Sequence, residues 1–151
     1  MSYRGIAIGF VRASWKEQLR ALLSIALLLV VPVAMTVVSF ARVRAALLWA
    51  ANRCRALALG DPSPRRIVRT VEIVDRRVPG HRTCLARSLT SEALLRFHGH
   101  SPVHRIGVDS SDDDGFAAHS WLEHDGEILI GDLEEMDRYD KLPPLDQLEG
   151  P

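Results

Sequence analysis

The sequence is poor in cysteine, with only Cys54 and Cys84 among 151 residues. They lie in different halves of the chain, so the disulfide framework of a small secreted domain is not expected. A chain whose reactive thiol must stay free suits a reducing compartment, which favours a cytoplasmic location. Cys54 lies between two arginines on an expected helix and is interpreted as a small packing residue.

The chain also lacks an excess of either charge, because 19 Lys and Arg residues balance 19 Asp and Glu residues. The two halves differ, however. Residues 1–60 carry eight basic residues and one acidic residue, whereas residues 61–151 carry eleven basic and eighteen acidic residues. The basic residues of the first half are not interleaved with stacking aromatic residues, and the acidic half would repel phosphates. Composition therefore predicts two unlike regions and argues against nucleic-acid binding.

No charged residue occurs over residues 21–41, which follow a Ser-Trp-Lys-Glu capping box at Ser14. This length meets the criterion for a membrane span. Pro32, in its middle, is expected to kink or end the helix, and a second helix is expected over residues 33–60. Basic residues flank the apolar stretch on both sides and give no orientation. Two arrangements remain open for residues 14–59. They form either a helical hairpin that packs on the second half, on a partner or on the membrane surface, or a true membrane span.

The second region begins with a proline-rich turn that also starts a helix over residues 64–78. The apolar residues of this helix recur at helical spacing and predict one buried face: Ile67, Val71, Val74 and Val78. Pro79-Gly80 ends this helix and leads the chain toward Cys84.

Cys84 follows the helix-breaking residues 79–83 and precedes a helical run that stops at Gly99. It is therefore expected in the first turn of a helix. There the partial positive charge of the helix terminus favours thiolate over thiol, and the backbone N–H of Cys84 is available to an oxyanion. Cys84 is the candidate nucleophile.

Asp125-Gly126 is a strong hairpin signal between two expected strands. These strands cover residues 117–124 and 127–132. A two-residue loop would pair Leu122 with Leu129 and place His119 directly opposite Asp132, with Cβ atoms about 5 Å apart. A carboxylate so placed can hold an imidazole in one tautomer and stabilise its charged form. His119 is thus the candidate base and Asp132 the orienting acid, although a loop one residue longer would break this register.

Metal sites are not expected. Histidines gather around the end of the Cys84 helix and in the hairpin, but their spacing matches no closed zinc site. The acidic run over residues 109–115 lacks the spaced ligands and closing glutamate of a calcium loop and is interpreted as a solvated loop. A strand is expected over residues 103–108, and the polar tail, residues 133–151, is expected to be partly ordered.

Four motifs occur in a specific order. They are Cys84-Leu-Ala-Arg-Ser-Leu, a helix end over residues 94–99, the strand Arg105-Ile-Gly-Val, and Ala118-His-Ser-Trp-Leu-Glu before Asp125-Gly126. Together they resemble the stand-alone, transglutaminase-like leader peptidase of lasso peptide biosynthesis, over residues 64–132. The resemblance implies an α+β fold with a papain/transglutaminase-like core, in which the nucleophile helix packs on a small antiparallel sheet behind an N-terminal apolar helical region.

The resemblance also implies an activity. Such a cysteine peptidase removes the leader from a precursor peptide and needs no cofactor, and Cys84, His119 and Asp132 match its nucleophile, base and orienting acid. Residues 1–60 show no winged-helix pattern, which implies a separate leader-recognition protein beside an asparagine synthetase-like lasso cyclase. Ser120 stands where the family often has alanine, and the second oxyanion donor is unassigned. Two rivals remain: a transglutaminase-type acyltransferase with the same triad, and a membrane-tethered binding module with a vestigial triad.

Overall fold

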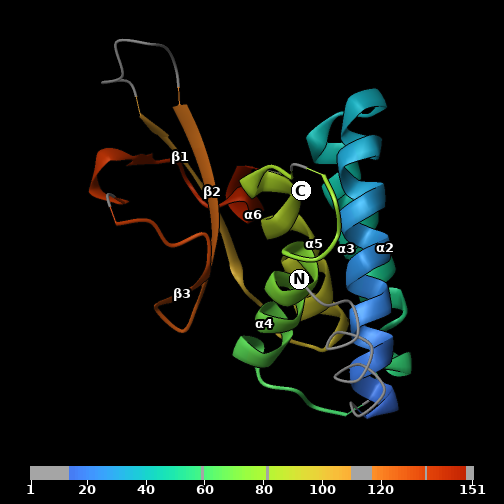
Figure 1. The fold of residues 1–151 in the computed structure, drawn as a ribbon. Helices are drawn as coiled ribbons and strands as arrows, with labels where there is room; N and C mark the ends of the chain where they lie inside the picture. Colours follow the sequence, from blue (N-terminus) through green and yellow to red (C-terminus); the bar gives the residue numbers. More distant parts are fainter. Residues whose placement is uncertain (1–13, 59, 81, 110–116, 135, 149–151) are drawn as a thin grey trace.

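The computed structural model describes residues 14–58, 60–80, 82–109, 117–134 and 136–148. The helices are α2 (Trp15–Val37), α3 (Phe40–Arg53), α4 (Pro64–Asp75), α5 (Cys84–Phe97) and α6 (Leu145–Leu148), with 3-10 turns η1 (Arg55–Leu57) and η2 (Met136–Arg138). The strands are β1 (Val103–Asp109), β2 (Ala117–His124), β3 (Glu127–Ile130) and β4 (Asp140–Lys141), which form an antiparallel sheet in the order β3-β2-β1-β4 (Figure 1). The predicted α+β class is confirmed.

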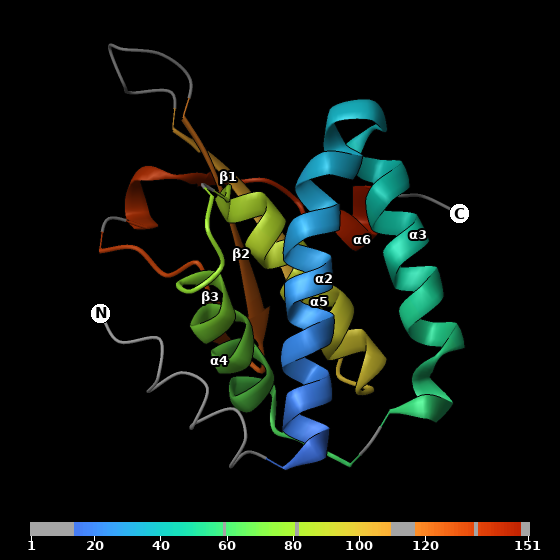
Figure 2. The same cartoon turned by 45° about the vertical axis from the view of Figure 1, so that its right-hand side comes forward.

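The elements form layers, with α5 at the centre. One face of the sheet is covered by α4 and α5, and α2 and α3 pack on the outer side of these two helices (Figures 1 and 2). Because α5 contacts β2 on one side and α2, α3 and α4 on the others, nearly all of its middle is buried. The helix that carries Cys84 is therefore the element on which the rest of the fold packs.

The predicted apolar face of α4 is confirmed for three of its four residues, but the helix ends at Asp75 and not at residue 78, so Val78 packs partly buried from beyond its end. Ile67, Val71 and Val74 are buried, and they share a core cluster with Leu28 of α2. This core therefore joins residues from both sides of the expected division at residues 60 and 61. The division into two domains stays a prediction.

The apolar segment folds differently from the expectation. The capping box at Ser14 is confirmed, but α2 runs through Pro32 to Val37 instead of kinking or ending there. Proline removes one hydrogen bond of a helix interior. Here packing offsets that loss, because Val31 is buried before the proline and Ala34 packs against the same cluster after it. The chain turns only beyond Val37, so the expected second helix starts at Phe40 and ends at Arg53, well short of Gly60.

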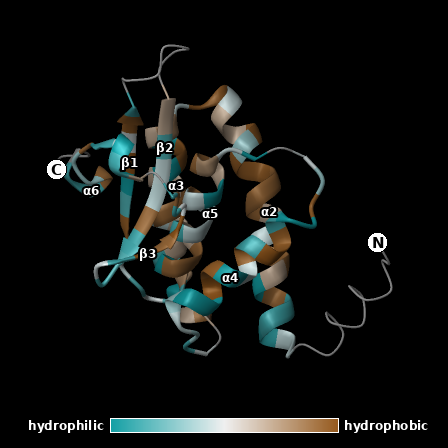
Figure 3. Cartoon of the chain, turned by 60° about the vertical axis from the view of Figure 1, so that its left-hand side comes forward, coloured by the Kyte–Doolittle hydropathy of each residue, from teal (hydrophilic) through white to brown (hydrophobic). Residues whose placement is uncertain are grey.

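One side of α2 packs on the protein and the other does not. The buried residues are Arg20, Ser24, Leu28 and Val31. The exposed large apolar residues along α2 are Trp15, Leu19, Leu22, Leu29, Val30, Val33 and Val37, and they contribute to its hydrophobic colouring in Figure 3. By length and composition alone α2 could cross a membrane, a test that core helices of soluble proteins and signal sequences also pass.

The hairpin is present, but its register is only partly as predicted. Asp125 and Gly126 both have positive φ, 51° and 81°, as a two-residue turn of this kind requires. The pairs next to the turn match the prediction, but Leu122 pairs with Ile130 and not with Leu129. Leu129 is the extra residue of a β-bulge, which lets Ile130 join Leu122 in the core. The predicted register is therefore wrong from Leu122 outward.

The C-terminal segment is more structured than its composition suggests. It contributes the edge strand β4 and the short helix α6, whose Leu145 is buried. Most of the expected acidic loop, residues 110–115, lies outside the described residues.

Candidate active site

Cys84 is the first residue of α5, as predicted. Thr83 is the N-cap, and its side-chain oxygen accepts a hydrogen bond of 3.2 Å from the backbone N–H of Ala86. The first-turn N–H groups of a helix have no intrahelical acceptor, so the N–H of Cys84 is directed out of the helix end. The Cys84 side chain carries a free thiol and is half-buried, whereas that of Cys54 is exposed. The geometry thus combines a reachable thiol with a donor for an oxyanion.

The segment before Cys84 is fastened to the end of α4. The guanidinium of Arg82 forms an ion pair with the Asp75 carboxylate and donates hydrogen bonds to the backbone carbonyls of Asp75, at 2.7 Å, and of Val78. Arg87 of α5 lies 3.8 Å from the same carboxylate. Asp75 and Arg82 are almost fully covered by their neighbours, so these contacts fix where α5 begins.

A hydrogen bond shows which side of α5 Cys84 occupies. The hydroxyl of Ser88 donates to the backbone carbonyl of Ser120 on β2, at 3.0 Å. Residues four apart lie on the same face of a helix, so Cys84 lies one turn before Ser88 on the face that contacts β2. The nucleophile is therefore next to the strand that carries His119.

His119 is nearly buried, with 7% of its surface exposed, and its ring is held from two sides. Its Nε2 lies 2.6 Å from the carbonyl oxygen of Gly131, and its ring stacks on Trp121 at a centroid distance of 6.0 Å. Tyr139 packs on the same ring at 5.6 Å. A carbonyl can only accept, so Nε2 carries the proton of the hydrogen bond, and in the neutral imidazole Nδ1 is the basic nitrogen.

The three predicted residues are not assembled. The Ser120 side chain points toward α5, where His104 links it to Glu92, and successive strand side chains point to opposite faces. His119 and Trp121 therefore lie on the face of β2 away from α5. Among the described hydrogen bonds, none joins Cys84 to His119.

Asp132 is also apart from the imidazole. The bulge moves it one position out of the predicted opposition to His119, and the residue is exposed. Within the described part of the chain, its carboxylate has no hydrogen bond or ion pair. The backbone carbonyl of the preceding residue, Gly131, occupies the place at Nε2 that the prediction gave to Asp132. The assignment of Cys84, His119 and Asp132 as a triad stays a prediction.

A buried polar network lies beside this site. Arg44 of α3 and His104 of β1 both bind the carboxylate of Glu92 on α5, each with a contact of 2.6 Å, and His104 Nε2 lies 2.8 Å from the hydroxyl of Ser120. Each of the four residues is at most 2% exposed. Burial would raise the pKa of Glu92, but the hydrogen bonds from His104 and Arg44 outweigh it, so the pKa is lowered.

Sequence reasoning missed this network. A serine, a histidine and a carboxylate in this order could serve as a nucleophilic triad, yet burial closes it to a substrate, so it ties α5 to the sheet instead. One signal was present: Glu92 is the only charged residue between Arg87 and Arg96, on a helix whose neighbouring positions are apolar or small. An acid there needs a buried partner.

The family model described as the transglutaminase-like superfamily matches residues 27–143. The chain belongs to this superfamily. No curated protein and no solved structure matched the chain. The matched range contains Cys84, His119 and Asp132, and it begins within α2, so the transglutaminase-like region includes part of the N-terminal helical segment.

Members of the transglutaminase-like superfamily are generally cysteine-dependent hydrolases or acyltransferases. In the parts of this transglutaminase-like chain that the structure describes, no three His, Cys, Asp or Glu side chains converge to hold a metal ion. The arrangement that can support chemistry is the Cys84 thiol with its helix terminus, next to the strand that holds His119.

Proposed function

We propose that this transglutaminase-like protein is a cysteine peptidase that removes the leader from a lasso peptide precursor. The observation that carries the proposal is the free Cys84 thiol at the first turn of α5, on the face that contacts the His119 strand. Membership of the superfamily supports cysteine-dependent chemistry. The series of motifs from Cys84 to Gly126 supports the narrower role.

The proposed reaction starts with proton transfer from Cys84 to His119. The thiolate attacks the carbonyl carbon at the leader–core junction, and the backbone N–H of Cys84 donates to the oxyanion. The imidazolium, stabilised by Asp132, then gives its proton to the departing amine of the core. Water activated by His119 hydrolyses the remaining thioester, and the thiol regains its proton.

The proposal requires one movement. His119 is bonded to Gly131 on the far face of β2, so the ring must leave this carbonyl and turn around the strand edge before it can reach Cys84. Among the described residues, ladder pairing on this side of β2 stops at Leu122, but Gly131 lies against Ser120 and Trp121 at the same edge, so the Gly131 segment must move together with the ring. We propose that this rearrangement takes place when the substrate binds.

In the proposed function this protein acts in the cytoplasm together with partner proteins. A separate leader-recognition protein would present the precursor, and an asparagine synthetase-like cyclase would join the freed amine to an Asp or Glu side chain. The helices over residues 14–59 would hold the peptidase near these partners or near the membrane surface.

The test is incubation of the purified protein with a precursor peptide, with and without the leader-recognition protein, followed by mass spectrometry. We expect two fragments whose masses sum to that of the precursor plus one water. Cys84→Ala should abolish cleavage, whereas Cys54→Ala, which removes the other free thiol, should leave it unchanged. Cleavage by the folded Cys84→Ala protein would contradict the assignment of the nucleophile.

Two other functions give different results in this assay. An acyltransferase would use the same thioester but pass it to an amine, which yields a cross-link or an amide exchange in place of hydrolysis. The binding module is favoured by one observation, namely the separation of Cys84, His119 and Asp132 in the structure. A thiol-directed probe tests it: a peptidase should react faster at half-buried Cys84 than at exposed Cys54, and a vestigial site should not.

A further inference from the structure

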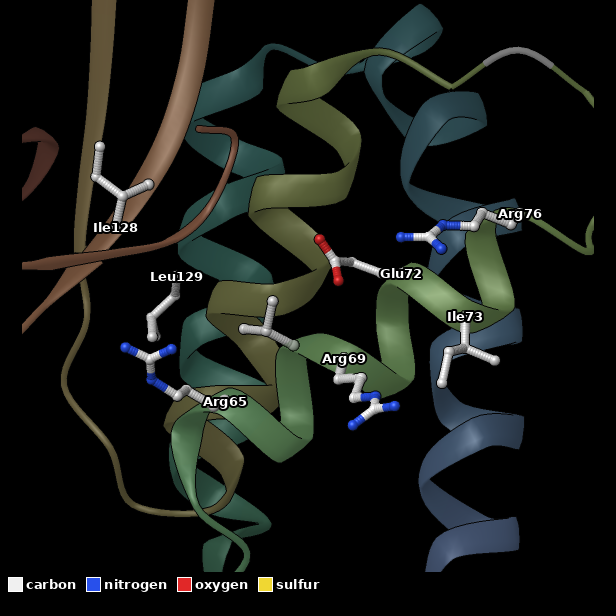
Figure 4. Close-up of a pocket in the computed structure, with 8 residues that line it drawn as sticks. Arg65, Arg69, Glu72, Ile73, Arg76, Ile128 and Leu129 are labelled. Carbon is white, nitrogen blue, oxygen red and sulfur yellow. The ribbon is translucent and has the colours of Figure 1, made fainter. Parts of the chain in front are cut away.

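A groove of about 340 Å³ separates α4 from β3. Figure 4 shows its lining, with Glu72 and Arg76 directed from α4 toward the sheet and Leu129 reaching from β3 toward Arg65. Charged residues form its α4 wall: Arg65, Arg69, Glu72 and Arg76. Apolar side chains, among them Val68 and Leu129, line the rest of the groove.

The charge of the groove is positive, with three arginines against one glutamate. Arg69 and Arg76 are exposed, and among the described contacts neither side chain has a hydrogen bond or ion pair. The Arg65 side chain crosses the opening of the groove and forms an ion pair with Glu127 of β3. Both side chains are largely exposed. A guanidinium presents paired donors that match a carboxylate, so the unpaired arginines suit acidic side chains.

The other wall of the groove is an edge strand. In the described sheet β3 has β2 on one side and no strand on the other. Its free edge can pair with an extended chain, while alternate side chains of that chain point toward the groove and away from it. Leu129, which is partly buried, and Ile73, which is 38% exposed, give an apolar residue a surface to cover.

The groove also points toward the candidate nucleophile. Arg76 follows Asp75, the residue whose carboxylate holds Arg82 just before Cys84. A chain that enters beside Arg65 and follows α4 would therefore leave the groove at the end nearest to the start of α5.

We propose that the groove between α4 and β3 binds an extended peptide segment whose groove-facing positions carry both acidic and apolar side chains. That this segment belongs to the peptidase substrate rests on the proposed function. The binding itself does not, and it is measured without cleavage.

The experiment uses full-length Cys84→Ala protein and fluorescence anisotropy. The probe is a fluorescein-labelled peptide in which glutamate, leucine and valine occupy every second position with serine between them, so that both kinds of side chain can face the groove, and the matched probe replaces each glutamate with glutamine. We expect the acidic peptide to bind at least about tenfold more tightly, and its affinity to fall with added salt. In Arg69→Glu/Arg76→Glu protein, affinity for the acidic peptide should fall about tenfold or more.

A control separates the groove from net charge. Arg42→Glu/Arg53→Glu changes the charge by the same amount at exposed positions of α3, outside the groove, and should leave binding unchanged. Equal binding of the two peptides, equal effects of the two double variants, or equal binding of a labelled oligothymidylate of the same charge would each overturn the proposal. Peptide binding without precursor cleavage would instead contradict only the proposed function.

Discussion

At the scale of single residues, His119 is oriented by a backbone carbonyl where a carboxylate was predicted. The Gly131 carbonyl fixes the tautomer, since it accepts from Nε2 and leaves Nδ1 unprotonated. A carbonyl carries only a partial charge, however, and stabilises an imidazolium less than a carboxylate does. Asp132 is the adjacent residue, exposed and free to approach once the ring moves. Orientation and charge stabilisation are thus divided between neighbouring groups that act in turn, Gly131 before the ring moves and Asp132 after it.

This division predicts an intermediate effect for Asp132→Asn. The substitution removes the charge but keeps a side-chain amide oxygen that can accept from Nε2, so we expect kcat for precursor cleavage to fall about tenfold to a hundredfold with little change in KM. Asp137→Asn, at another exposed acid of the same segment, is the control and should change neither constant. Unchanged kcat in Asp132→Asn would show that the charge of Asp132 does not stabilise the imidazolium, and complete loss would show that an uncharged acceptor cannot replace the carboxylate.

At the scale of elements, the network around Glu92 joins α3, α5, β1 and β2. Buried ion pairs contribute little net stability, because desolvation offsets their attraction, but the removal of one partner is costly. Arg44 also contacts Asp146 of α6, so the network reaches the C-terminal segment as well. The polar groups around Glu92 therefore hold these elements in one arrangement, and the loss of any one group leaves a buried partner without its ion pair or hydrogen bond.

The lowered pKa of Glu92 gives this network a pH dependence. Burial raises the pKa, but the hydrogen bonds from His104 and Arg44 bring it below the usual 4.5, so the unfolded chain binds this proton more readily than the folded protein. The resulting stability is fully present above pH 4.5 and is lost as pH falls through the lower, folded value. The acid limb is the fall of the free energy of unfolding as pH decreases. We expect Glu92→Gln to make this limb shallower, and to lower the free energy of unfolding by about 3 kcal/mol at pH 7.

Urea unfolding at a series of pH values measures both effects. Glu134→Gln, at an exposed position, is the control and should keep the wild-type acid limb. An acid limb in Glu92→Gln as steep as in the wild type would show that other groups set the acid sensitivity.

The elements also show what sequence patterns can and cannot predict. The apolar face of α4 and the first turn of α5 were predictable because they depend on local spacing and capping. The bulge at Leu129 was not, because it depends on which residue packs with Leu122 in the core. For the same reason no local pattern showed that the fold buries Arg44 against Glu92. The residues of the candidate site thus stay a prediction from motifs, and their arrangement in space could not be predicted from local patterns.

At the scale of the whole molecule, α2 is part of the folded core. Leu28 packs in one cluster with α4, α5 and the sheet, and Val31 packs in another with α3 and α5. A helix that crossed a membrane on its own would make neither contact. The exposed side of α2 remains a surface for a partner or a membrane, because lying on such a surface would not require α2 to leave the core.

Two adjacent leucines of α2 distinguish the packed helix from a free span. Leu28 is 1% exposed and Leu29 is 49% exposed, yet they have the same side chain in the same helix. We expect Leu28→Ala to lower the free energy of unfolding of the purified protein by about 2–5 kcal/mol, because it leaves a cavity among α2, α4 and α5. Leu29→Ala should cost less than about 1 kcal/mol. Urea denaturation followed by circular dichroism measures both values, and equal, small effects would mean that α2 is not packed on the transglutaminase-like core in solution.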